Sequence, residues 1–181
     1  GARSFGAEPA QVIDRAVALH HGMAAGGLSS CGKHFPGHGD TGVDSHLALP
    51  RVDHGLERLW SVELPPFVAA VSANMPAIMS AHIVVSAVDP NHPATLSPAV
   101  MRILREDLGY DGAILSDDLE MAAIADHYGV EEAIGRGLDA GIDLFLMCAD
   151  REKQLVALET LRNAPPARVA QSQARIAALR R

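Results

Sequence analysis

Apolar residues recur along this chain in two alternating patterns, which together predict a repeated order of helix and strand. Stretches with apolar residues three or four positions apart alternate with short, nearly continuous apolar runs. The first pattern is typical of amphipathic helices, and the second is typical of strands that are buried on both faces. Strands that alternate with helices in this way predict a parallel sheet covered by helices.

The boundaries of the predicted elements follow from prolines, glycines and capping residues. The first helix is expected to begin near Pro9, because proline is favoured in the first helical turn, and to end near Gly26. Ser97 and Pro98 form a cap and a first turn, so a helix is expected from there to Leu108. The remaining helices are expected over residues 56–73, with a restart at Pro65-Pro66, over residues 119–140, with a break near Tyr128-Gly129, and over residues 151–162 and 166–180. The strands are expected over residues 28–34, 77–85, 112–116 and 142–147.

Two α/β architectures fit this pattern. One is a small open parallel sheet. The other is half of a closed (β/α)8 barrel, because four units in 181 residues are about half of what a barrel of ~250 residues contains. No linker or low-complexity segment divides the sequence, so we expect one domain over residues 1–181. The hydrophobic pattern alone leaves the choice between the two architectures open.

Composition excludes some classes of function. The formal net charge of −7 argues against a nucleic-acid surface, because phosphate contacts need clustered Lys and Arg. No apolar run reaches the ~20 residues of a membrane span, so none is expected. Cys31 and Cys148 lie in apolar segments and are expected to be buried thiols rather than a disulfide. The sequence opens at Gly1 without a methionine, and we expect that further sequence precedes it.

Titratable residues accompany three of the four predicted strands. Lys33 and His34 end the first strand, His82 lies in the second, and Asp117 and Asp118 follow the third. The carboxyl ends of parallel strands meet at one edge of a sheet, where functional residues gather in α/β folds. We therefore expect a functional site at this edge.

The loop after the first strand holds the densest cluster of such residues. Residues 33–46 contain three histidines, two aspartates and a lysine. A metal site is one candidate, because His34 and His38 lie four positions apart, as metal ligands on a helix do. Pro36 and Gly37 lie between them and break any helix there, which makes the metal site the weaker candidate.

Acid–base chemistry is the favoured interpretation of the same loop. Asp44 and His46 lie two positions apart, and residues with this spacing face the same side of an extended segment. The carboxylate could then orient the imidazole and favour its protonated form. A solvated loop histidine without a chemical role is the alternative.

The two adjacent carboxylates at the end of the third strand cannot both face one pocket. Asp117 and Asp118 point to opposite faces of a strand, so one of them is expected to bind backbone or to cap the next segment. The strand is apolar on both faces, so alternation does not say which aspartate faces the pocket. A capping pair with no catalytic role is the alternative.

Taken together, five motifs resemble glycoside hydrolase family 3, in its β-N-acetylglucosaminidase branch. The motifs are Arg3-Ser4-Phe5-Gly6, Lys33 through His46, Met79-Ser80-Ala81-His82, Ser116-Asp117-Asp118-Leu119 and Ala140-Gly141-Ile142-Asp143. The β-glucosidases of this family usually share the Lys-His-Phe start of the loop motif but lack its Asp-Ser-His end. The resemblance implies that the four strands are strands five to eight of a TIM-type (β/α)8 barrel, whose first half is absent from this sequence.

The resemblance also implies an activity and a role for each site residue. The activity is retaining hydrolysis by a β-N-acetylhexosaminidase, through a covalent glycosyl-aspartate and without a metal or an organic cofactor. Asp117 is the implied nucleophile, His46 the general acid/base and Asp44 its dyad partner. The implied sugar-binding residues, for the hydroxyl and acetamido groups, are Arg3, Lys33 and His34.

The expected substrate is a small carbohydrate with a terminal β-linked N-acetylglucosamine, such as a muropeptide recycled from peptidoglycan. We expect this recycling to be cytoplasmic. One alternative is a phosphorylase, because an imidazole acid/base repels phosphate less than a carboxylate would. Another is an inactive, sugar-binding half barrel, because the sugar-binding residues of the first half are absent.

Overall fold

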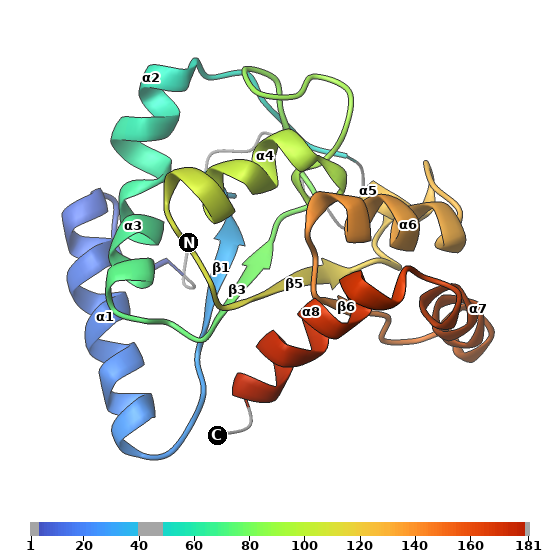
Figure 1. Cartoon of the computed structure of the whole chain (residues 1–181). Helices are drawn as coiled ribbons and strands as arrows, with labels where there is room; N and C mark the ends of the chain where they lie inside the picture. Colours follow the sequence, from blue (N-terminus) through green and yellow to red (C-terminus); the bar gives the residue numbers. More distant parts are fainter. Residues whose placement is uncertain (1–3, 40–48, 180–181) are drawn as a thin grey trace.

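The protein forms a parallel four-stranded sheet (Figure 1), seen in a computed structural model that describes residues 4–39 and 49–179. The strands, in the order in which they lie side by side, are β1 (Cys31–Phe35), β3 (Ala77–Ser80), β5 (Ala113–Asp118) and β6 (Leu144–Leu146). All neighbouring pairs are parallel, so the carboxyl ends of the strands lie along one edge of the sheet. The predicted α/β class with a parallel sheet is confirmed.

Helices cover one face of this sheet. Ile78 and Ile114 are fully buried and belong to one apolar cluster with Phe67, Met101 and Leu104 of the covering helices. The α-helices are α1 (Pro9–Ala25), α2 (Leu56–Arg58), α3 (Pro65–Ser72), α4 (Pro98–Arg102), α5 (Ala122–Ala125), α6 (Val130–Ala140), α7 (Arg151–Arg162) and α8 (Pro166–Ala178). Shorter helical segments of other types are η1 (Leu59–Glu63), η2 (Ala94–Leu96) and η3 (Ile103–Asp107). Over the described ranges, every helix is too short or too polar to cross a bilayer.

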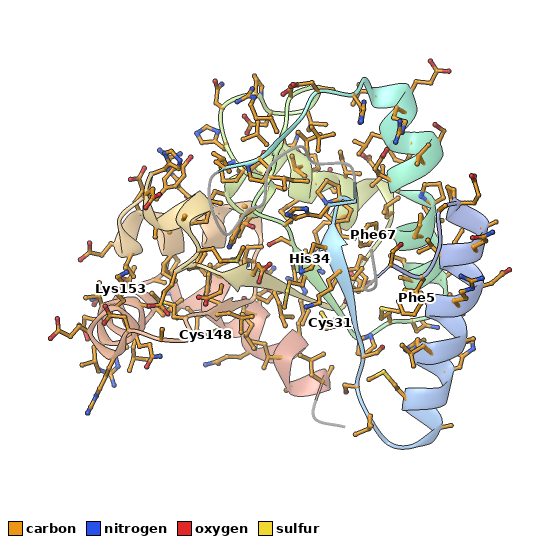
Figure 2. All side chains as sticks on the ribbon, turned by 180° about the vertical axis from the view of Figure 1, so that it is seen from behind. Phe5, Cys31, His34, Phe67, Cys148 and Lys153 are labelled. Atoms are coloured by element: carbon orange, nitrogen blue, oxygen red, sulfur yellow. The ribbon has the colours of Figure 1, made fainter. Side chains whose placement is uncertain are left out.

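The opposite face of the sheet is less covered. Met79 of β3 lies in register with Lys33 of β1 and Leu115 of β5, and Leu115 in turn with Leu144 of β6. These apolar side chains are only half-buried, whereas Ile78 and Ile114 beside them are fully buried. In the view from behind, no described helix lies in front of β1 (Figure 2).

The apolar run predicted as one strand over residues 77–85 forms two strands. Its first part is β3, and its last part is β4 (Val84–Val85), which pairs in parallel with β2 (Arg51–Val52) in a separate small sheet. Both parts are buried, so hydrophobic periodicity could not reveal the break between them. The break falls at Ala81, whose N–H bonds to the carbonyl of Phe35 at 2.8 Å.

The expectation that both cysteines are buried was wrong. Cys31 and Cys148 are free and exposed. Cys31 lies on β1, which pairs on one side only in the described part of the chain, and Cys148 follows β6 at the other end of the sheet. Leu28, the apolar neighbour that suggested burial of Cys31, is itself 63% exposed.

A buried carboxylate ties the last helix to the sheet. Asp143, just before β6, has a fully buried side chain, and its Oδ2 accepts hydrogen bonds from Ile114 N (3.0 Å) and Arg105 Nη2 (2.5 Å). Its Oδ1 accepts from Arg168 Nη1 and Arg175 Nη1 of α8, both at 3.2 Å, and from Ser172 Oγ at 2.8 Å. Because buried carboxylates need such partners, this cluster fixes α8 against the amino-terminal side of the sheet.

Candidate active site

Asp117 lies at the carboxyl end of β5 with its two carboxylate oxygens in different environments. Oδ1 accepts a hydrogen bond from the N–H of Asp118 at 2.9 Å. Oδ2 lies 3.4 Å from Nε2 of His34, which comes from the end of β1. Both side chains are 23% exposed, so the pair is sheltered but reachable from solvent. The structure thus brings together two of the residues that the sequence singled out.

Irregularities in strand pairing occur at both members of this pair. The register between β1 and β3 shifts between Lys33 and Phe35, so that His34 is the extra residue. The register between β5 and β6 shifts between Leu115 and Asp118, on either side of Asp117. Such bulges bend a strand and re-aim the side chains next to them, and here they lie at the ends of the two strands that carry the pair.

The segment after His34 is held by an aromatic anchor and a glycine. Phe35 is fully buried and packs edge-to-face against Phe67 of α3, with ring centroids 5.1 Å apart. Gly37 has φ +133°, and a Cβ at this position would lie 2.9 Å from the side chain of Glu63. Only glycine fits there, which explains the Pro-Gly step in the loop motif. Figure 2 shows His34 and Phe67 in this region.

Asp118 has a local role that differs from that of its neighbour. Its Oδ1 accepts a hydrogen bond from the N–H of Glu120 at 3.0 Å and closes the turn after β5. Asp117 is therefore the aspartate whose carboxylate meets a residue of another strand, a distinction that the apolar alternation of the strand left open.

The end of β5 is fastened to β6 and to the start of α7. Leu146 N–H donates to Ser116 Oγ at 2.9 Å, and Leu119 N–H donates to the carbonyl of Leu146 at 3.0 Å. The carboxylate of Glu120 accepts from the N–H groups of Ala149 (2.6 Å) and Asp150 (2.8 Å). These bonds, that from Ala149 above all, lower the pKa of Glu120 and keep it ionised. The backbone on both sides of Asp117 is thereby fixed from the β6 side.

On the β3 side, the buried His82 contacts the same strand end. Its Nε2 lies 3.0 Å from the carbonyl oxygen of Asp118, and its Nδ1 lies 2.8 Å from Oγ1 of Thr95. Burial lowers the pKa of His82, and the carboxylate of Asp117 opposes this shift without reversing it. Sequence reasoning noted His82 but gave it no role; its position two residues after Ser80, inside an apolar run, was the signal.

The remaining predicted site residues divide into two groups. Lys33 is exposed and lies in register with Met79, on the less covered face of the sheet. Arg3, Asp44 and His46 lie outside the described residues.

No cluster of three His, Cys, Asp or Glu side chains suited to a metal ion occurs within residues 4–39 and 49–179. His34 and His38 lie edge to face with ring centroids 5.9 Å apart. His34 Nε2 also lies 3.4 Å from Oδ2 of Asp117.

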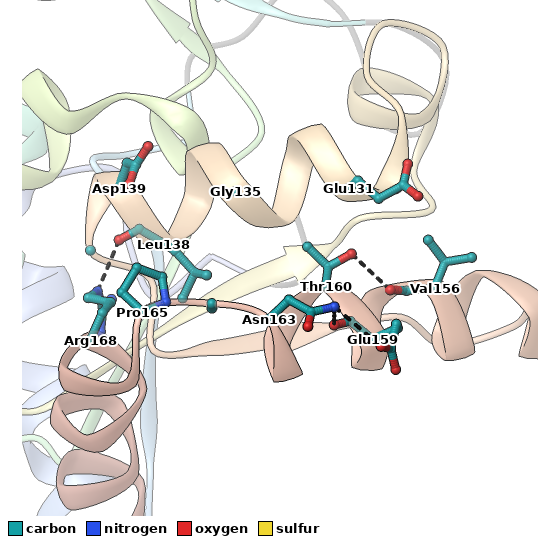
Figure 3. Close-up of a pocket in the computed structure, with 12 residues that line it drawn as sticks. Glu131, Gly135, Leu138, Asp139, Val156, Glu159, Thr160, Asn163, Pro165 and Arg168 are labelled. Carbon is teal, nitrogen blue, oxygen red and sulfur yellow. Dashed lines mark hydrogen bonds between the residues drawn. The ribbon is translucent and has the colours of Figure 1, made fainter.

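The molecule also has a large groove away from the strand ends. It has a volume of about 830 Å³ and lies between α6, α7 and α8 (Figure 3). Several polar groups that line it are bonded to neighbours: Arg168 Nε donates to Leu138 O, Thr160 Oγ1 to Val156 O, and Asn163 Nδ2 to Glu159 O. The groove offers a surface between helices rather than a set of converging chemical groups.

Comparison with known proteins gives one family. The glycosyl hydrolase family 3 N-terminal domain matches residues 1–179. A beta-hexosaminidase from Neisseria gonorrhoeae (strain NCCP11945) is 43% identical over 149 residues, which are 82% of this chain and 41% of that protein. A beta-hexosaminidase from Methylococcus capsulatus is 40% identical over 165 residues, which are 90% of this chain and 49% of that protein. The chain thus spans less than half the length of these two relatives.

Solved structures agree with this result. A family 3 beta-N-acetylglucosaminidase from Paenibacillus sp. str. FPU-7 superposes with a TM-score of 0.95 and 42% identity, over 99% of this chain and 36% of that chain. The beta-N-acetylglucosaminidase from Thermotoga maritima superposes with a TM-score of 0.91 and 33% identity, over 99% of this chain and 40% of that chain. Sequence and structure therefore agree that this chain belongs to glycosyl hydrolase family 3.

Proposed function

We propose that this chain carries the nucleophile and the proton donor of a retaining β-N-acetylhexosaminidase. Its substrate is a terminal β-linked N-acetylglucosamine, in a muropeptide or a related N-acetylhexosaminide. The observation that carries the proposal is the sheltered pair of Asp117 and His34, 3.4 Å apart at the carboxyl ends of two parallel strands. Relatives named beta-hexosaminidase support the substrate class.

The reaction proceeds in two steps. In the first, Asp117 attacks the anomeric carbon to form a glycosyl-aspartate, while His46 gives its proton to the departing glycosidic oxygen. In the second, His46 takes a proton from water, which displaces the aspartate and releases the sugar with its original configuration. Asp44 orients His46. The roles of Asp44 and His46 rest on the family motif, since both lie outside the described residues.

Lys33 and His34 lie on the side of the substrate. Both lie in β1, His34 Nε2 lies 3.4 Å from Asp117 Oδ2, and the N–H groups of both side chains can donate to sugar hydroxyls and to the acetamido oxygen. Arg3 completes this set in the family motif. His34 approaches Oδ2 of Asp117. If it also binds the sugar, it would align the anomeric carbon with the nucleophile.

We further propose that the four-stranded sheet is half of a (β/α)8 barrel. Three observations support this: in the described part of the chain β1 and β6 each have one neighbour and one sheet face is less covered than the other, and the matched segments make up only 41% and 49% of the two relatives. Open strand edges invite pairing with other chains, which a closed barrel prevents. The first half of the barrel would then come from residues outside this sequence.

Removal of the proposed nucleophile tests the proposal. In the full-length protein, Asp117→Ala should lower kcat for a chromogenic N-acetylglucosaminide by on the order of 10⁴-fold, because it removes the carboxylate that forms the glycosyl-enzyme. Asp111→Ala is the matched control, since Asp111 is an exposed carboxylate just before the opposite end of β5, and its kcat should not change. Circular dichroism and thermal unfolding would verify that both variants fold.

Three further measurements sharpen this experiment. A slow, fluorinated substrate should leave a sugar mass on the peptide that contains Asp117. His46→Ala should reduce turnover most for substrates with poor leaving groups, which need protonation. Added phosphate would reveal whether the product is the free sugar or the sugar 1-phosphate. Near-normal turnover by Asp117→Ala would contradict the proposal.

A further inference from the structure

His82 is buried directly against the strand end that carries Asp117, and the mechanism above gives it no part. Its side chain is 1% exposed, and both ring nitrogens have partners within hydrogen-bonding distance. We propose that His82 is a positioning residue for Asp117, and that it acts through the main chain of Asp118 as a neutral imidazole protonated on Nε2. This inference rests on the proposed role of Asp117 as nucleophile.

The hydrogen bonds assign the proton on Nε2. The partner of Nε2 is the carbonyl oxygen of Asp118 at 3.0 Å, and a carbonyl can only accept, so Nε2 must carry a hydrogen. In a neutral ring Nδ1 then accepts, and its partner, Oγ1 of Thr95 at 2.8 Å, donates. Ser80 Oγ lies 2.8 Å from the same Oγ1 and can donate to it. The result is a series of hydrogen bonds that all donate in one direction, from Ser80 through Thr95 and His82 to Asp118.

Burial of His82 favours the neutral imidazole over the charged imidazolium. An imidazolium would donate from Nδ1 to Thr95, whose proton would turn to the carbonyl of Ala81 at 3.1 Å. Ser80, Thr95 and His82 are all fully or nearly fully buried, and burial lowers the pKa of His82. The carboxylates of Asp117 and Asp118 and the nearby backbone carbonyls act in the opposite direction but do not reverse the shift.

Two hydrogen bonds transmit the position of His82 to the nucleophile. The carbonyl of Asp118 is held by His82, and the N–H of the same residue donates to Oδ1 of Asp117 at 2.9 Å. Leu119, the next residue, is bonded to β6. The main chain at Asp118 is therefore fixed by His82, which follows β3, and through Leu119 by β6. It fixes one oxygen of Asp117, while the other faces His34.

A neutral ring also suits the chemistry. An imidazolium beside Asp117 would stabilise the carboxylate before attack and lose that interaction as the covalent bond forms, which would raise the barrier. A neutral N–H donor directed at a carbonyl holds the geometry without this cost. Positioning of this kind matters, because a misplacement of about 1 Å can lower a rate by ~10²-fold.

Two amide variants of His82 test the roles of its two ring nitrogens separately. In the full-length protein, His82→Gln can place an N–H near the position of Nε2, whereas His82→Asn reaches only the position of Nδ1. We expect His82→Asn to lower kcat by ~100-fold with little change in KM, and His82→Gln to recover at least about tenfold of that loss. His21→Gln, at an exposed position on α1, is the control and should not change kcat.

The pH profile separates a positioning role of His82 from a proton-transferring one, and the tautomer tests the assigned proton. Thr95→Val removes the hydroxyl that holds Nδ1, and should lower kcat, whereas Thr95→Ser should restore most of it. Because His82 does not exchange a proton in the reaction, His82→Gln should keep both limbs of the pH profile. Long-range ¹H–¹⁵N spectra of histidine-labelled wild-type protein should show a ring protonated on Nε2 only.

The outcomes separate this inference from the proposed function. An active Asp117→Ala variant would overturn the proposed function. An inactive Asp117→Ala variant with a fully active His82→Asn variant would overturn the positioning role alone. Loss of one limb of the pH profile in His82→Gln, or a ring protonated on Nδ1 in the wild type, would overturn it as well. The spectrum of the wild-type protein decides the tautomer even where a variant fails to fold.

Discussion

The adjacent residues Asp117 and Asp118 have the same side chain but different surroundings, because one lies within a bulge of the strand and the other closes the turn that follows. Asp117 faces His34, and Asp118 binds the N–H of Glu120. A single pleated strand would direct the two carboxylates to opposite faces, and the register shift at Asp117 adjusts the direction of the first. Two identical residues thus differ in surroundings rather than in chemistry.

Acid should destabilise the fold through His82. Burial lowers the pKa of this imidazole, so below the unfolded-state pKa of ~6.5 the unfolded chain binds a proton that the folded chain does not. The free energy of unfolding should therefore fall as the pH falls below ~6.5, by up to about 1.4 kcal/mol per pH unit from this group. Urea unfolding of the full-length protein at a series of pH values should give a shallower dependence for His82→Gln, by about one proton. Parallel curves for the two proteins would contradict this.

The sequence predicted which residues meet at the strand ends better than it predicted their surroundings. His34 and Asp117 stand out in the sequence because polar residues at the carboxyl ends of apolar strands are typical of functional sites. The structure places the two side chains together. The choice between Asp117 and Asp118 depended on a bulge, which leaves no mark in the pattern. The exposure of Cys31 depended on its strand having a neighbour on one side only in the described ranges.

At the scale of elements, helices with strong end signals were predicted well, and the strand that breaks in its middle was not. Pro9 and Gly26 bracket α1, as expected from the residues that start and stop helices. The split of residues 77–85 into β3 and β4 arises where Ala81 bonds to Phe35, a partner far away in sequence. Long-range hydrogen bonds of this kind are invisible to local periodicity.

The attachment of α8 should depend strongly on Asp143. Asp143→Ala should lower the free energy of unfolding by about 3–5 kcal/mol, because three arginines that converge on one buried carboxylate would lose their counter-charge. Asp139→Ala, at an exposed position on α6, should change it by less than about 0.5 kcal/mol. Urea unfolding of the full-length protein measures both. A loss below about 1 kcal/mol for Asp143→Ala would show that α8 is held by other contacts.

At the scale of the whole molecule, three surfaces are left open in the described part of the chain: one side of β1, one side of β6 and the apolar face of α7. Leu155 and Leu158 lie three positions apart on α7 and are 56% and 45% exposed. Figure 1 shows α7 at the same end of the molecule as β6. In the proposed barrel, the missing units would pair with these strands and cover this helix.

Substitution of the α7 leucines tests that arrangement. In the full-length protein, the double variant Leu155→Gln, Leu158→Gln should lower the free energy of unfolding by roughly 2–4 kcal/mol, because two leucines would lose apolar burial. Arg151→Gln, at an exposed position on the same helix, should change it by less than about 0.5 kcal/mol. A double variant as stable as the wild type would show that this face stays in solvent, which would argue against the half-barrel proposal.

The cluster around Asp143 has a consequence for synthesis on the ribosome. Arg105 precedes the aspartate in the chain, but Arg168 and Arg175 follow it by 25 and 32 residues. Chains emerge from their amino terminus, so the sheet can collect its strands in order of translation while this carboxylate still lacks most of its cationic partners. Until α8 leaves the ribosome, Arg105 is the one arginine of this cluster available to Asp143, and α8 does not yet pack against the amino-terminal side of the sheet.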